Sequence, residues 1–269
     1  MEKHTCDNAT KTSACRKSWP WAWVPSLYFA EGLPYVIVIT LSVVMYKQLG
    51  LGNAEVAYYT GWFYLPWFIK PLWSPFVDLL KTKRWWIVAM QLLMGAGMAG
   101  IAFTLPMQHY LQWTLAIFWL LAFSSATHDV AADGFYMMAL DEGDQSFFVG
   151  IRSTFYRLAT LAGQGGMLII VDWFIRHNGN DAQQAWIHSF FLIATLFIAV
   201  GVYHACRLPR PHTDVPRQFA ARDLFKEFAH TFVTFFHKEG ALPALLFMLL
   251  FRFPEAQLVK IGKLFLMDS

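Results

Sequence analysis

The sequence predicts an all-α integral membrane protein, with a bundle of six transmembrane helices followed by the beginning of a seventh helix. Hydrophobic residues make up 57% of the 269 residues and charged residues only 14%, whereas a soluble domain holds about 25% charged residues. The apolar residues form runs that reach the roughly 20 residues needed to cross a bilayer as a helix. These runs lack the alternation of apolar and polar residues that is typical of barrel strands.

The predicted segments follow one another along the chain. We expect residues 1–19 to form a cytoplasmic tail, because they are polar and lack the apolar core of a secretory signal. The bundle occupies 20–206, with spans near 20–46, 55–80, 85–105, 110–140, 147–173 and 185–206. A polar, basic stretch at 207–240 is predicted to be a cytoplasmic connector, and 241–269 to be part of a seventh span. We therefore expect a truncated chain, a fragment, or a half-sized protein that dimerises.

The positions of Lys and Arg predict that the N-terminus lies in the cytoplasm. With this orientation the outer loops hold only Lys47 and Arg176. The other loop residues of this kind, Arg152 among them, gather in the tail, the cytoplasmic loops and the connector, as cytoplasmic segments do. The net charge of +3 is too small to indicate a nucleic-acid partner.

Two carboxylates lie within the apolar stretch SSATHDVAADGFYMMAL (124–140). Asp129 and Asp133 are four residues apart and therefore share one face of a helix. Like charges repel and burial disfavours the charged form, so a carboxyl group that gains and loses a proton is one interpretation, best placed at Asp129. Alternatively, Asp133 lies near the cytoplasmic interface and pairs with a basic residue. Arg157 in the next span is expected to pair with one of them or to extend to the interface.

Two further charged residues are candidates for a substrate cavity. Glu31 lies in FAEGLPY (29–35), where Gly and Pro suggest an irregular turn of the kind that lines transporter cavities. Lys70 precedes two prolines in FIKPLWSP (68–75), where a buried lysine could attract an anionic group. Glu31 could instead be an interfacial residue, and Lys70 could be neutralised by Glu31 or an aspartate.

Several of these motifs together resemble a known family. SPFVDLLKTKRWW (74–86) is similar to the signature that follows the second span of major facilitator transporters, although Ser-Pro replaces its leading Gly. FAEGLPY, FIKPLWSPFVD, AFSSATHDVAADG, FYRLATLAGQGG and FRFPEA, in this order, resemble the AmpG-type muropeptide permeases and the related acetyl-CoA transporter family. The resemblance covers the chain from about residue 21 to its end.

This resemblance implies a fold and a function. The chain would be the N-terminal six-helix half of a major facilitator fold, plus the start of helix 7. It would act as a proton symporter that imports anhydro-muropeptides across the bacterial inner membrane by alternating access, for peptidoglycan recycling. Its partners would be the lipid bilayer, a sugar-peptide solute, a proton and a missing C-terminal half. The span carrying Asp129 would line the cavity, and Asp78, Lys83 and Arg84 would form a cytoplasmic gate.

Other functions remain open at this stage. The chain could carry another anionic solute such as an acyl-CoA, or be a non-transporting membrane fragment or signalling protein. We expect no enzymatic activity, because an intramembrane protease needs its two carboxylates on separate, facing helices. No cofactor or metal is expected either, since His128, His204 and three scattered cysteines match no site with metal-ligand spacing.

Overall fold

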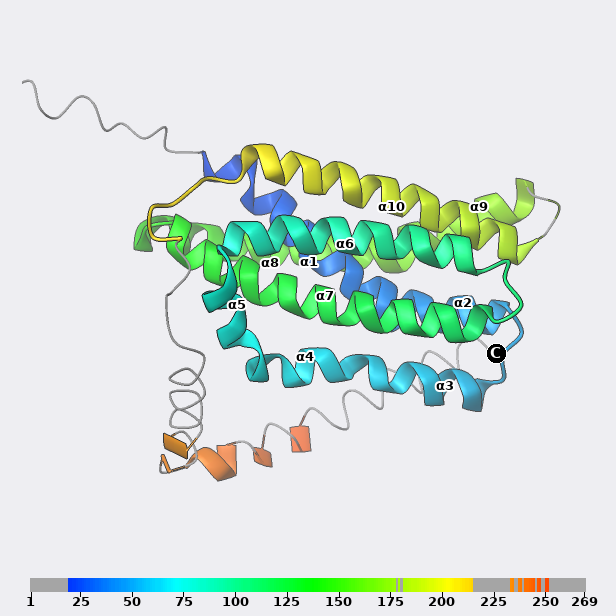
Figure 1. The fold of residues 1–269 in the computed structure, drawn as a ribbon, viewed down its shortest axis with the longest axis horizontal. Helices are drawn as coiled ribbons and strands as arrows, with labels where there is room; N and C mark the ends of the chain where they lie inside the picture. The colour runs from blue at the N-terminus through cyan, green and yellow to red at the C-terminus, as the bar shows by residue number, and fades with distance from the viewer. Residues whose placement is uncertain are drawn as a thin grey trace, which may run out of the picture.

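The computed structural model describes residues 19–214, apart from 178, 180 and the side chains of 78 and 79, together with scattered positions between 233 and 251. In this part the chain is helical and contains no strand, which confirms the predicted all-α class. Long helices lie side by side in one bundle (Figure 1). The predicted tail, most of the connector and most of the seventh span lie outside the described residues.

The first long helix, Pro20–Gln48, lies in the middle of the bundle, and most of its residues are buried. It consists of η1 (Pro20–Ala22), α1 (Val24–Val36), a wide π-type turn η2 (Ile37–Leu41) and α2 (Ser42–Gln48). The sequence predicted an irregular turn beside Glu31, and this position is wrong. The regular helix continues through Pro34, and the wide turn begins at Ile37.

The second predicted span is helical in short pieces. They are α3 (Asn53–Gly61), η3 (Trp62–Tyr64), α4 (Leu65–Ile69), η4 (Lys70–Leu72) and α5 (Ser74–Leu80). Pro66, Pro71 and Pro75 each stand in the first turn of a piece. Proline fits there because the first turn needs no N–H donor, whereas a helix interior does. One of these breaks falls at Lys70.

The remaining helices are continuous. They are α6 (Lys83–Thr104), α7 (Tyr110–Ala139), α8 (Glu142–Leu161), a wide turn η5 (Ala162–Gly166), α9 (Met167–His177) and α10 (Ala182–Arg207). Asp141 and Asp181 cap α8 and α10, each accepting a hydrogen bond from a backbone N–H of the first turn. In the described part, five helices are long and apolar enough to cross a membrane, with α8 to α9 counted as one.

Neighbouring helices pack in both relative directions. α6 packs antiparallel to both α7 and α10, whereas α8 runs parallel to α1, with Gly32 beside Tyr156 and Gly163 beside Val36 (Figure 1). The turns after α2, α6 and α9 lie at one end of the bundle, and those after α5, α7 and α10 lie at the other (Figure 1). Successive long segments therefore cross the bundle in alternating directions, as spans of a membrane protein do.

The α1–α8 contact is close because small residues form it. A Cβ atom on Gly32 would lie 2.8 Å from the carbonyl oxygen of Tyr156, and one on Gly163 would lie 2.9 Å from a valine methyl group of α1. Ala159 is also buried there. Gly166, in contrast, has open space where a Cβ would be.

Candidate functional site

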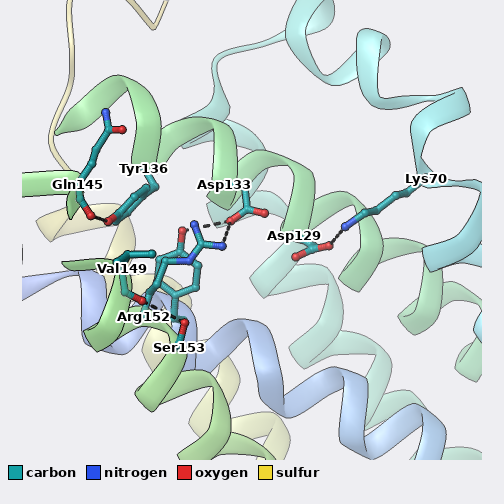
Figure 2. Close-up of polar contacts among 9 residues, drawn as sticks. Lys70, Asp129, Asp133, Tyr136, Gln145, Val149, Arg152 and Ser153 are labelled. Carbon is teal, nitrogen blue, oxygen red and sulfur yellow. Dashed lines mark hydrogen bonds and ion pairs between the residues drawn. The ribbon is translucent and has the colours of Figure 1, made fainter. Parts of the chain in front are cut away.

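The two carboxylates of α7 bind cations from opposite sides (Figure 2). The carboxylate of Asp129 forms an ion pair with the ammonium group of Lys70, which the break at η4 brings to α7. The Asp129 side chain is 17% exposed and that of Lys70 is 35% exposed. Of the interpretations left open for Lys70, the structure shows neutralisation by an aspartate.

Glu31 completes this first cluster from α1. It is buried, and its carboxyl group neighbours the Asp129 carboxyl group. Its Oε2 atom has no partner among the described residues. Ionised carboxylates only accept hydrogen bonds, so a hydrogen bond between these two groups would require a shared proton. The cluster therefore combines two neighbouring carboxyl groups and one cation.

Asp133 binds Arg152 of α8. Arg152 Nη2 lies 2.9 Å from Asp133 Oδ1, and the Tyr28 hydroxyl donates to the same oxygen at 3.2 Å. The centre of the guanidinium group lies 4.6 Å from the centroid of the Tyr28 ring and 5.2 Å from that of Tyr136. Both rings are within the range of cation–π attraction.

Of the two alternatives for Arg157, pairing with an aspartate or extension to the interface, the pairing is wrong. Asp129 is paired with Lys70 and Asp133 with Arg152, while Arg157 lies exposed on α8. Helix rotation explains the difference. Arg152 and Arg157 are five residues apart, which is a rotation of about 140°, so they lie on different faces of α8. Arg152 precedes the buried Ala159 by seven residues and therefore shares its face, and this spacing is the signal that could have identified Arg152.

The proposed gate residues contact the end of α10 and the start of the connector. The backbone N–H groups of Lys83 and Arg84 donate to the Asp214 carboxylate at 2.7 and 3.1 Å. The Arg84 side chain donates to the carbonyl oxygens of Leu208, at 3.2 Å, and of Ala205. The Asp78 side chain lies outside the described residues. These contacts fasten the loop before α6 to α10.

A second polar cluster is buried between four helices, and the sequence analysis missed it. Gln91 Nε2 of α6 lies 3.0 Å from His128 Nε2 of α7, and Gln91 Oε1 lies 2.9 Å from His204 Nδ1 of α10. His204 Nε2 in turn lies 2.9 Å from the Ser26 hydroxyl oxygen of α1. Metal-ligand spacing is a test of the two histidines alone, whereas a glutamine in an otherwise apolar span is the signal for this cluster. The described residues contain no group of three His, Cys, Asp or Glu placed to hold a metal.

Several proteins with similar sequences are named as transporters or permeases. The model of the Major Facilitator Superfamily matches residues 26–260. "Putative transporter AmpG 4" of Rickettsia conorii is 25% identical over 90% of this chain and 58% of its own length. "Anhydromuropeptide permease" of Escherichia coli (strain K12) is 24% identical over 89% of this chain and 47% of its own length. The chain thus spans about half the length of these relatives. Because the family match covers most of its residues, the chain belongs to the Major Facilitator Superfamily of multi-pass membrane transporters.

Proposed function

We propose that the chain forms part of a proton-coupled transporter that imports anhydromuropeptide-like solutes across the bacterial inner membrane by alternating access, with its N-terminus in the cytoplasm. The observation that carries this proposal is the cluster of Glu31, Asp129 and Lys70. It holds an exchangeable proton site beside a cation in the interior of the bundle. Charged groups at such depth are rare unless they serve a solute or ion pathway. The Escherichia coli relative, which is named an anhydromuropeptide permease, supports the choice of solute.

Each residue of the cluster has a role in this mechanism. A proton on Asp129 neutralises the carboxylate and releases Lys70 from its ion pair. Lys70 then attracts an anionic group of the solute. Glu31 shares the proton with Asp129, so that the buried pair does not carry two negative charges at once. Because Lys70 stands at a helix break, its release also frees the pieces around Pro71 to change their angle.

The cytoplasmic contacts supply the gate in this proposal. Arg84 and the backbone of Lys83 are bound to α10 and to Asp214. Asp78 would join them from α5. Opening toward the cytoplasm requires these bonds to exchange for bonds with another part of the transporter.

Uptake measurements test the proposal. Sealed right-side-out vesicles would be prepared from cells that express the protein in its own membrane and lack other muropeptide permeases. We expect an inward proton gradient to accelerate uptake of radiolabelled anhydromuropeptide. Asp129→Asn should remove this acceleration, with uptake falling about tenfold or more. Asp172→Asn is the matched control, because Asp172 pairs with Arg176 on an exposed surface of α9.

Two outcomes would contradict the proposal. Full proton-dependent uptake by the Asp129→Asn variant would exclude Asp129 as the coupling group. Proton-driven uptake of a radiolabelled acyl-CoA, with none of radiolabelled anhydromuropeptide, would assign the same cation to a different anionic solute.

A further inference from the structure

We propose that Arg152 is a second anion-binding position of the transporter, and that Asp133 occupies it in place of a solute carboxylate. Lys70 and Arg152 would then select solutes that carry two carboxylate groups. This inference rests on the proposed function and adds the class of solute and a residue that determines specificity. It starts from the two aspartates of α7, each of which forms an ion pair with a cation from another element (Figure 2).

Arg152 is held in a fixed orientation. Its guanidinium lies near two tyrosine rings, at 4.6 and 5.2 Å from their centroids, and the ion pair to Asp133 is made through Nη2. A guanidinium presents five N–H donors in a planar fork that matches the two oxygens of a carboxylate. Asp133 is bound through Oδ1, which also accepts the Tyr28 hydroxyl. A second carboxylate could therefore bind the fork more fully than Asp133 does.

The ion pair is accessible. The Arg152 side chain is 29% exposed and that of Asp133 is 39% exposed, whereas the buried polar cluster around Gln91 is closed. A charged pair at this depth is not stable against lipid, so its exposed side must face an aqueous path or a protein surface. A solute in that path can reach the guanidinium.

The two ion pairs also lie close together along α7. Asp129 and Asp133 are four residues apart, which is a rise of about 6 Å along α7. Their cations come from different elements, Lys70 from η4 and Arg152 from α8, on opposite sides of the carboxylates (Figure 2). A solute that replaces both aspartates must therefore present two anionic groups, not one.

The exchange conserves charge. A proton binds the Asp133 carboxylate, the ion pair opens, and a solute carboxylate takes its place on Arg152. When Asp129 is protonated in the same way, Lys70 binds the second solute carboxylate. Lysine is a point charge that accepts many geometries, whereas the arginine fork discriminates planar carboxylates. Arg152 is therefore the residue expected to set the specificity.

Binding to the purified protein tests this inference without any proton gradient. The full chain in lipid nanodiscs would be titrated by calorimetry at one pH with succinate, glutarate, adipate and pimelate, and with the monomethyl ester of each. We expect at least one diacid to bind about tenfold more tightly than its ester, the difference expected for one charge-assisted pair. Arg152→Lys should lower this ratio several-fold, because lysine keeps the charge but lacks the fork. Asp133→Asn should raise diacid affinity several-fold, because it removes the internal competitor.

The controls separate this inference from misfolding and from the proposed function. Arg176→Lys alters a similar Arg–Asp pair, 2.8 Å long, on exposed α9, and should leave the ratio unchanged. If Arg152→Lys fails to give a monodisperse protein, the Asp133→Asn variant still tests the inference, because its diacid affinity should rise. Equal binding of diacids and esters, or unchanged discrimination in Arg152→Lys, would overturn the inference while leaving proton-driven uptake through Asp129 intact. Tighter binding of methylenediphosphonate than of any diacid would overturn the assignment to carboxylates.

Discussion

Gln91 is the side chain on which the buried polar cluster depends. Its amide presents a donor and an acceptor at the same time, and each faces a different histidine ring. Gln91, His128 and His204 are at most 1% exposed. The cluster joins α1, α6, α7 and α10, so it fixes the rotation of four helices about their axes. Membrane helices have little hydrophobic driving force for one another, which makes such bonds important for specificity.

Replacing Gln91 should therefore destabilise the bundle. Gln91→Leu keeps the approximate volume but leaves two buried histidine nitrogens without a partner. We expect the free energy of unfolding in detergent to fall by about 2 kcal/mol or more, since an unsatisfied buried group costs roughly 1–3 kcal/mol. Urea titration followed by tryptophan fluorescence measures this change. Gln184→Leu, at an exposed position of α10, is the control, and equal stabilities of the two variants would contradict the role of Gln91.

At the level of residues, the sequence predicts which charges matter better than it predicts their partners. Asp129, Asp133 and Lys70 could be identified because charges within apolar runs are rare. Their pairing depends on depth and on helix rotation, which composition does not contain. Arg152 was counted only as a basic residue near a cytoplasmic loop, although its long side chain reaches Asp133.

The close contact between α1 and α8 lies beside Glu31, because the next residue, Gly32, forms part of it. It brings the wide turns η2 and η5 together. Gly32 and Gly163 provide the space, because each lacks the Cβ atom that would collide with the partner helix. Residues with small side chains at such spacing are typical of tightly packed membrane helices.

Two glycines of the same turn test this contact. Gly163→Leu should force α1 and α8 apart and lower the free energy of unfolding by about 1–3 kcal/mol, the usual cost of overpacking. Gly166→Leu should change it by less than about 0.5 kcal/mol, because the position faces open space. Thermal unfolding in detergent, followed by light scattering and fluorescence, compares the two. A larger loss for Gly166→Leu than for Gly163→Leu would be incompatible with the packing described here.

Element boundaries divide into those that the sequence could predict and those that it could not. Proline interrupts a helix at its own position, and the second segment is broken at Pro66, Pro71 and Pro75. The wide turn η2 lies in IVITL, which contains no proline or glycine, whereas η5 lies in the glycine-rich AGQGG. They depend on the packing of one helix against another, which a local pattern does not contain.

The whole molecule has two chemically different ends. The end that carries the turns after α5, α7 and α10 holds Lys81, Lys83, Arg84, Arg207 and Arg210, whereas the other end holds Lys47 and Arg176. Basic residues concentrate on the cytoplasmic side of membrane proteins. The proposed orientation, with the basic end in the cytoplasm, would expose Cys6, Cys15 and Cys206 to the cytoplasm.

Labelling of these cysteines tests the orientation. A membrane-impermeant maleimide added to spheroplasts should leave the unmodified protein unlabelled, and it should label the protein in inverted vesicles. The thiol introduced by Gln108→Cys, in the exposed turn before α7, should instead be labelled in spheroplasts and remain unlabelled in inverted vesicles. Labelling of the unmodified protein in intact spheroplasts would place the tail and the end of α10 outside.

The bonds at Asp214 have a mechanical consequence for everything that follows them in the chain. The stretch from Arg207 to Asp214 could reach about 23 Å if it were extended. It cannot use this reach, because Asp214 is bound to the first turn of α6 and Arg84 holds the end of α10. The later part of the chain therefore starts from an anchor beside α6. A tilt of α6 and α10 would therefore move Asp214, and with it the point from which the later part of the chain continues.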